Sequence, residues 1–210
     1  MKIKMLALAL LASCALAFSQ PADVSRDEEG LEKVCGIISS HKITKGDFRQ
    51  LKFIHKLKRE MVSSGIFLIS SDDGILWQTQ KPYFSTMVVT QKAIIQTNSK
   101  GKKSVLSSES NPSFEQFSKV ISSVFTGKVE ILKENFDVEF IGSSDSWNIN
   151  LLPQNSTVRN VVSEIEMAGH DSIDSMVIHE PSGDYIRHEF LSHIYPERLS
   201  DEDKAFFDEK

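Results

Sequence analysis

The stretch from Ser63 to Thr90 constrains the fold more than any other part of the sequence. Two runs of β-forming residues flank a turn at Asp73-Gly74, which is a strong short-range signal for a hairpin. Ile66–Ile69 and Met87–Val89 are apolar at consecutive positions rather than at alternate ones. Because successive side chains of a strand point to opposite faces, these strands carry apolar side chains on both faces of a sheet. Each of the two faces therefore requires an apolar cover.

Residues 1–19 are typical of a secretory signal peptide. Lys2 and Lys4 form a basic start, an apolar run follows, and Ala17-Phe18-Ser19 places small residues ahead of a cleavage site. The apolar run is too short to span a membrane as a helix. We therefore expect cleavage after residue 19, localisation in the periplasm, and a single mature domain over residues 20–210.

A second interpretation of the same segment stays open. Leu11-Ala12-Ser13-Cys14 matches a bacterial lipobox, in which Cys14 would be acylated and would anchor the protein to a membrane. The apolar residues that follow, Ala15–Phe18, favour simple cleavage, because a lipoprotein usually becomes polar after its cysteine.

Charge and cysteine content exclude several classes of protein. Loss of Lys2 and Lys4 with the signal peptide moves the formal charge from −5 to −7. An acidic chain without basic blocks is a poor candidate for binding nucleic acid or anionic lipid. Cys35 is the one cysteine left after cleavage, so it can form no intramolecular disulfide. Its helical spacing within residues 26–41 favours a buried, unreactive thiol.

The motifs of catalysis and metal binding are missing from the sequence. It contains no G-x-S-x-G elbow, no glycine-rich phosphate loop and no H-E-x-x-H helix. His170, His179, His188 and His193 match no ligand motif, and we expect them to be exposed on strands or turns. Asp72-Asp73-Gly74 lacks the alternating oxygens of a calcium loop. We therefore expect no enzyme activity, no cofactor and no metal site.

The order of elements predicts one α+β domain. Residues 26–41 form a helix, and Phe48 to Leu106 form about six sequential antiparallel strands. A second helix begins at Ser113, strands of period two resume at Phe136, and Ser200 caps a terminal helical turn with Phe206 and Phe207.

A long antiparallel sheet of this kind curls, and helices laid over its concave face can leave an apolar hollow. Such a hollow suits an acyl chain, because each buried CH₂ contributes about 0.8 kcal/mol. The alternative is that the apolar side chains pack against one another or against the helices. For the first case we predict these lining residues: Phe53, Ile66, Leu68, Trp77, Met87, Val89 and Ile94.

The order and spacing of short motifs over residues 27–194 resemble the outer-membrane lipoprotein carrier (LolA-like) family. The motifs are Phe48-x-Gln50-x-Lys52, Ser64-Gly65-x-Phe67, Gly74-Ile75-Leu76-Trp77, Lys81-Pro82-Tyr83, Val89-Thr90, Gly127-Lys128, Phe136-Asp137-Val138, Trp147-x-Ile149-x-Leu151-x-Pro153 and Gly183-Asp184. The resemblance implies an unclosed β-barrel whose helices cover an apolar cavity. It also implies a shuttle that takes acylated cargo from an inner-membrane exporter and delivers it to an outer-membrane acceptor without making or breaking a bond.

The resemblance is to a divergent branch of that family. The carriers place an Arg-Pro pair just before the strand with the tryptophan, and the arginine fastens the helical lid, whereas this chain has Ser70-Ser71-Asp72-Asp73 there. We expect a monomer that binds the acyl chains of lipoproteins or of other lipids. Two alternatives stay open: an outer-membrane-anchored acceptor of the same pathway, if Cys14 is lipidated, and an envelope binding domain with a solid core.

Overall fold

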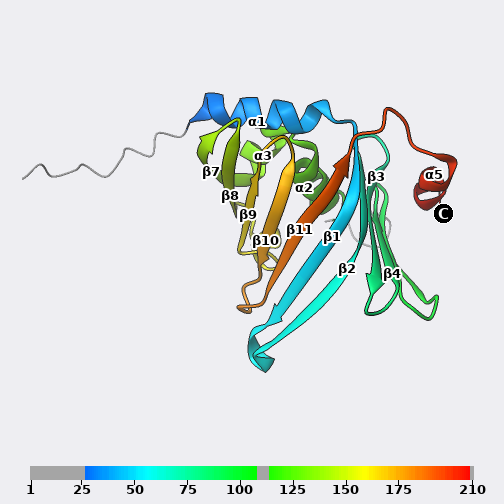
Figure 1. Cartoon of the computed structure of the whole chain (residues 1–210). Helices are drawn as coiled ribbons and strands as arrows, with labels where there is room; N and C mark the ends of the chain where they lie inside the picture. The colour runs from blue at the N-terminus through cyan, green and yellow to red at the C-terminus, as the bar shows by residue number, and fades with distance from the viewer. Residues whose placement is uncertain (1–26, 108–113, 209–210) are drawn as a thin grey trace, which may run out of the picture.

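One curved antiparallel sheet forms most of the molecule (Figure 1). The computed structural model describes residues 27–107 and 114–208. The sheet has eleven strands in the order β6-β5-β4-β3-β2-β1-β11-β10-β9-β8-β7. Because the edge strands β6 and β7 do not pair with each other, the sheet curls without closing. The predicted fold class, an α+β unclosed barrel, is confirmed.

Two meanders make up this half-barrel, and the antiparallel pair β1–β11 joins them. The first consists of β1 (Ile43–Ile54), the 3-10 turn η1 (His55–Leu57), β2 (Arg59–Ser70), β3 (Gly74–Lys81), β4 (Ser85–Val89), β5 (Ala93–Thr97) and β6 (Lys103–Ser107). The second consists of β7 (Phe136–Ser143), β8 (Ser146–Pro153), the single turn α4 (Ser156–Arg159), β9 (Glu164–Gly169), β10 (Ile173–His179) and β11 (Tyr185–Ile194).

The helices cover the two faces of the sheet unequally. α1 (Glu28–Ser40), α2 (Phe114–Thr126) and α3 (Val129–Asn135) lie across the concave side, which we call the inner face (Figure 1). α5 (Asp201–Phe207) lies against the opposite side, the outer face. α2 and α3 connect the edge strand β6 to the edge strand β7, so this connection crosses the hollow of the half-barrel.

α1 agrees with the helix predicted for residues 26–41. Asp27 caps it, its carboxylate accepting a hydrogen bond of 2.9 Å from the Gly30 amide, and the chain leaves the helix at His41. The helix buries Leu31, Val34, Cys35 and Ile38. Cys35 is 1% exposed, which confirms the prediction of a buried thiol, and burial raises the pKa of that thiol to about 11.

Both apolar faces of the Ser63–Thr90 hairpin are covered, as its sequence requires. On the inner face, Phe67 and Trp77 belong to a large core cluster that includes side chains of α1, α2 and α3. On the outer face, Leu68 and Leu76 belong to a second cluster that is completed by the C-terminal segment through Leu199, Phe206 and Phe207. Alternation along each strand therefore sends neighbouring apolar residues into two separate cores.

The C-terminal segment is held in place by polar contacts as well. Ser200 and Asp203 form a capping box at the start of α5, as predicted for this helix, and the Asp203 carboxylate pairs with Lys45 of β1 at 2.8 Å. Burial raises the pKa of Asp203, but the hydrogen bonds from Lys45 and Ser200 outweigh it and hold that pKa below its usual value. Across the described residues, no helix has the length and apolar character needed to cross a membrane.

Candidate functional site

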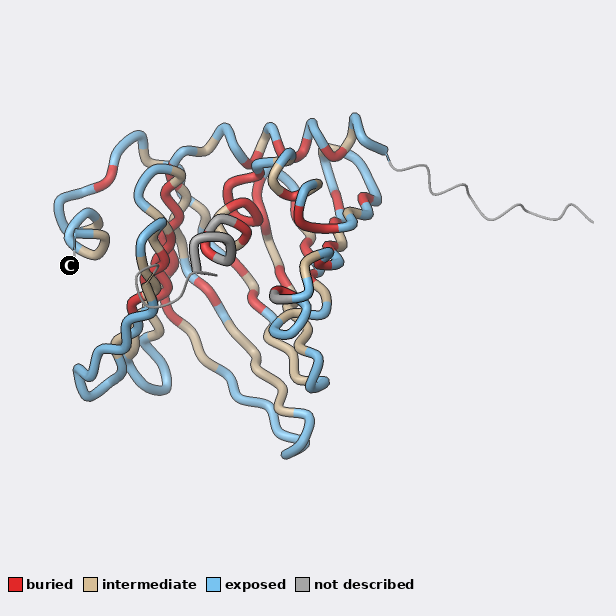
Figure 2. Tube along the Cα trace, turned by 180° about the vertical axis from the view of Figure 1, so that it is seen from behind, coloured by how far each residue is buried: buried red, intermediate tan, exposed pale blue. Residues whose placement is uncertain are grey.

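The inner face of the half-barrel is covered along only part of its length. Figure 2 shows buried residues where α1–α3 cross the strands and exposed or half-buried residues where the strands extend beyond the helices. Trp77, 8% exposed, lies under the helices, whereas Met87, directly opposite it in the sheet register, is 36% exposed. Farther along, Met61 is 57% exposed, and Ile186 is half-buried. The uncovered part of the inner face thus contains exposed and half-buried apolar side chains.

Four of the predicted lining residues lie on this inner face. Trp77, Val89 and Ile94 belong to or pack against the inner core cluster, and Met87 pairs with Trp77. Their role in lining a cavity for cargo stays a prediction.

The other three predicted residues lie on the outer face. Leu68 belongs to the cluster under the C-terminal segment. Ile66 shares its face by alternation, and Phe53 stacks on Tyr185 with ring centroids 5.2 Å apart. The prediction placed them with Trp77. In a run of consecutive apolar residues, the sequence does not reveal whether the odd-numbered or the even-numbered positions point to the inner face.

The space between the helices and the sheet is filled by side chains. Within the described residues, the apolar void beneath α1 measures about 20 Å³ and is bordered by Phe67, Phe125 and Phe190. Such a volume holds about one water molecule and no acyl chain. Val120, Val124 and Phe125 of α2 fill the remainder of the hollow. Where α2 packs on the sheet, an acyl chain can therefore reach the inner face only if α2 moves.

Two contacts join α2 to the first meander of the sheet. The Phe125 ring packs edge-on against Trp77, with ring centroids 5.0 Å apart. The Ser118 hydroxyl donates a hydrogen bond of 2.7 Å to the Thr90 carbonyl, in the turn between β4 and β5. The Ser70 hydroxyl donates a hydrogen bond of 2.6 Å to the Asp73 carboxylate and closes the β2–β3 turn.

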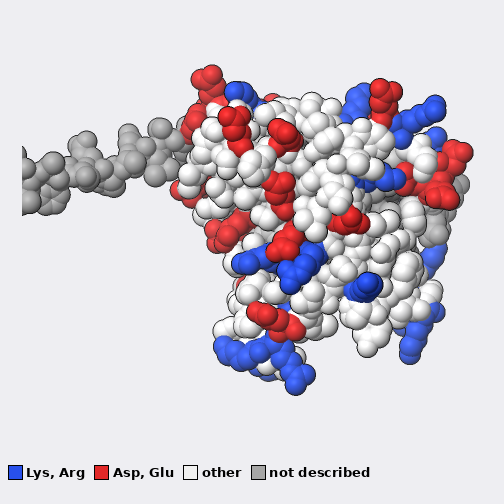
Figure 3. Space-filling view, in the orientation of Figure 1, with Lys and Arg blue, Asp and Glu red and all other residues white. Residues whose placement is uncertain are grey.

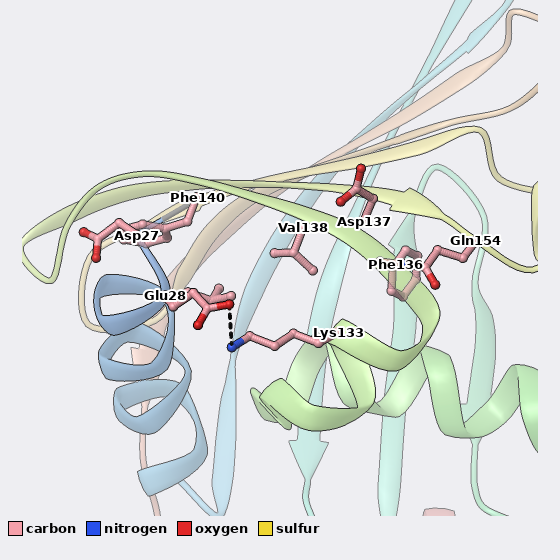
Figure 4. A pocket seen from close by; sticks show the side chains of 9 residues that line it. Asp27, Glu28, Lys133, Phe136, Asp137, Val138, Phe140 and Gln154 are labelled. Atoms are coloured by element: carbon pink, nitrogen blue, oxygen red, sulfur yellow. Dashed lines mark ion pairs between the residues drawn. The ribbon is translucent and has the colours of Figure 1, made fainter. Parts of the chain in front are cut away.

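Two wider clefts lie at the margins of the helices. One, of about 400 Å³, separates α2 from the β2–β3 turn, and its lining includes Ser70, Ser122 and Ile131. The other, of about 200 Å³, lies between α1, α3 and β7, where Lys133 forms an ion pair with Glu28 at 3.9 Å (Figure 4). Exposed pairs of this kind contribute about 0–1 kcal/mol, so the second cleft is not rigidly closed.

An aromatic group at the centre of the inner face contains a buried histidine. His188 is 7% exposed and packs beside Phe48, Trp77 and Phe190, with ring centroids 5.9–6.1 Å from its own. Burial lowers the pKa of His188 to about 4. The expectation that this histidine is exposed was wrong. Its alternation with Ile186 and Phe190 was the signal in the sequence that could have placed it on the apolar face.

The outer face carries a group of possible metal ligands that no sequence spacing indicates. Glu164, Glu166 and His179 offer ligand atoms that all lie within 4.8 Å of one another, and His179 Nε2 contacts a Glu166 oxygen at 2.8 Å. The register of β9 against β10 brings these residues together. Exposed groups of this kind are common without a metal, and the expected lack of a metal site stays a prediction.

Charged side chains are unevenly distributed over the surface. In the view of Figure 3, acidic groups are frequent on the side of α1 and β7–β10, and basic groups gather at the tip between β1 and β2. The sequence of that tip is His55-Lys56-Leu57-Lys58-Arg59, and the Leu57 side chain there is 61% exposed. The tip therefore presents positive charge beside an exposed apolar side chain, at the uncovered end of the sheet.

The structure defines a class of fold: an unclosed antiparallel half-barrel with a helical cover over its apolar inner face. The sequence model of the outer membrane lipoprotein carrier protein LolA matches residues 39–203, and the chain belongs to this family. The family predicted from the sequence motifs is thus confirmed.

Solved structures with a similar arrangement are distant in sequence. A DUF1329 family protein from Desulfovibrio piger is 8% identical, with a TM-score of 0.48 and coverage of 87% of this chain and 97% of its own. A LolA superfamily protein from Nitrosomonas europaea is 9% identical, with a TM-score of 0.47 and coverage of 86% and 96%. LprF from Mycobacterium bovis is 9% identical, with a TM-score of 0.38 and coverage of 82% and 95%. A search of curated protein sequences found no match.

Proposed function

We propose that this protein is a periplasmic carrier that binds the acyl chain of a lipoprotein or lipid against the inner face of its half-barrel. Membership of the LolA family supports the proposal. The observation that carries it is the boundary in the inner face where buried Trp77 meets partly exposed Met87. Because apolar side chains continue from the exposed part of the inner face into the covered part, an acyl chain can first bind at the exposed part and then become buried.

Binding exchanges one apolar occupant of the hollow for another. The acyl chain enters along the uncovered part of the inner face and displaces α2, so that it replaces Val124 and Phe125 against Trp77, Val89 and Ile94. Burial of a palmitoyl-sized chain contributes on the order of 10 kcal/mol before costs. Loss of the α2 contacts opposes that gain, which keeps the cargo releasable.

The carrier takes its cargo from an inner-membrane exporter and delivers it to an outer-membrane acceptor. It works as a monomer, without a cofactor, and it makes and breaks no covalent bond. Residues 1–19 act as the cleaved export signal. These residues lie outside the part of the chain that the structure describes.

A second candidate function is an acceptor that stays anchored in the outer membrane. The Leu11-Ala12-Ser13-Cys14 segment, also outside the described residues, favours it. Mass analysis of the mature N-terminus separates the two: a free N-terminus near Gln20 supports the carrier, and a diacylated or triacylated Cys14 supports the acceptor.

The test of the proposed function is lipid binding by the purified mature protein. Organic extraction followed by mass spectrometry should recover an acyl lipid, and a fluorescent fatty-acid probe should bind. Met87→Glu places a charge on the uncovered part of the inner face and should weaken probe binding at least about tenfold. The matched control is Leu191→Glu, because Leu191 is 50% exposed and lies on the outer face. A protein that carries no lipid and ignores the probe refutes the proposal, as does equal weakening by both variants.

A further inference from the structure

We propose that Trp77 and His188 form a polar subsite in the inner face that recognises the amide group at the head of an amide-linked acyl chain. The inference rests on the proposed function and specifies the chemical class of its ligand. The two residues come from the two different meanders, on β3 and β11.

Both side chains are buried and carry a polar atom without a partner. Trp77 is 8% exposed and His188 is 7% exposed. Their rings are neighbours, with centroids 5.9 Å apart. Among the described residues, Trp77 Nε1 and His188 Nδ1 are the buried side-chain nitrogens that have no hydrogen-bond partner. Buried polar atoms are nearly always paired, so two unpaired ones on adjacent rings indicate a ligand group that completes them.

The contacts of His188 determine what this ligand group must offer. His188 Nε2 lies 3.0 Å from the Gln50 Oε1 atom. A carboxamide oxygen only accepts hydrogen bonds, so Nε2 carries the proton and Nδ1 is left as an acceptor. Burial keeps the pKa of His188 at about 4, so the ring is neutral at neutral pH. Trp77 Nε1–H can only donate. The subsite thus presents one donor and one acceptor.

A secondary amide matches this pair. Its carbonyl oxygen accepts from Trp77 Nε1, and its N–H donates to His188 Nδ1. An ester of the same chain supplies the carbonyl but no donor, so it leaves His188 Nδ1 buried and unpaired, which is unfavourable. The subsite should therefore prefer amide-linked over ester-linked acyl chains.

The position of the subsite agrees with the entry route. Phe125 of α2 packs edge-on against Trp77 at 5.0 Å and lies near Phe190 at 6.3 Å. Displacement of α2 by the acyl chain thus uncovers the rings that recognise its head group. Apolar side chains surround the pair, so water competes poorly for the same hydrogen bonds.

The experiment compares N-methylhexadecanamide with methyl hexadecanoate as competitors of a fluorescent fatty-acid probe. The wild-type protein should bind the amide about tenfold more tightly, which corresponds to about 1.4 kcal/mol. His188→Phe keeps an aromatic ring but removes the acceptor, so it should abolish the preference by weakening the amide alone. Trp77→Phe removes the donor that serves both ligands, so it should weaken both by the same factor and leave the preference in place.

The outcomes distinguish failure of the amide subsite from failure of the proposed carrier function. Equal binding of amide and ester by the wild-type protein overturns the subsite and leaves the carrier function standing, and this readout needs no variant to fold. A preference that survives His188→Phe, in a variant that melts cooperatively, also overturns the subsite. If neither competitor nor the probe binds, the carrier function and the subsite fall together.

Discussion

Replacement of His188 by phenylalanine should remove much of the acid sensitivity of this protein. Burial lowers the pKa of His188 from about 6.5 to about 4, so between these values the unfolded chain binds a proton that the folded chain excludes. The unfolded state is therefore favoured as the pH falls from about 6.5 to about 4. Above that window the group contributes no pH dependence.

The size of the effect follows from the two pKa values. At pH 4.5 the linkage relation gives a loss of about 2.5 kcal/mol, a large part of the roughly 5–15 kcal/mol that stabilises a typical domain. Phenylalanine preserves a ring between Phe48 and Phe190 but binds no proton, so the variant should lack this loss. The difference in unfolding free energy between variant and wild type should thus shift by about 2.5 kcal/mol between pH 7.5 and pH 4.5.

Urea unfolding of both proteins at the two pH values measures that shift directly. Other titrating groups affect both proteins equally and cancel in the comparison. Phe136→Leu is the matched control: it alters a buried ring of the inner core that does not pack on His188, so it should lower stability by the same amount at both pH values. Parallel pH profiles for the wild type and His188→Phe would show that the folded protein accepts the proton, and would refute the argument.

Three further predictions concern the two cores and the strand geometry. Cys35, with its pKa raised to about 11, should resist iodoacetamide at pH 8 in the native protein and react once urea unfolds it, as mass spectrometry would show. Leu199→Ala should cost about 2–5 kcal/mol in urea unfolding yet leave probe affinity unchanged, because it opens only the outer core. Gly65→Ala should lower the melting temperature, because its Cβ would overlap the Gln78 carbonyl of the neighbouring strand; an unchanged melting temperature would contradict this.

The sequence was sufficient to predict the fold and to predict that both faces of the hairpin are covered. It was not sufficient to predict which side chains point to the inner face and which to the outer face. Hairpin signals, capping residues and helical spacing predicted the meander, α1 and the capped α5. These signals could not predict that Leu68 faces α5 while Trp77 faces α2. Which positions of a strand point to which face is determined by strand pairing across the sheet. His188 and Gln50, 138 residues apart, meet for the same reason, through the β1–β11 register.

The outer face of the hairpin has its own cover, which is the C-terminal segment. The second apolar face of the hairpin needs no cargo, since Phe206 and Phe207 pack over it. Under the proposed function, cargo and α2 therefore compete for one surface, the inner face around Trp77.

This competition determines how the apparent affinity for cargo depends on the position of α2. If α2 leaves the hollow in a fraction f of the molecules, the apparent Kd equals the intrinsic Kd divided by f. A substitution that weakens the α2 contacts without touching the sheet should thus tighten binding. Ser118→Ala removes the hydroxyl that bonds the Thr90 carbonyl, a hydrogen bond worth about 1 kcal/mol, so probe affinity should rise up to about fivefold while the unfolding free energy falls. If instead affinity fell with stability, α2 would be part of the binding surface rather than its competitor.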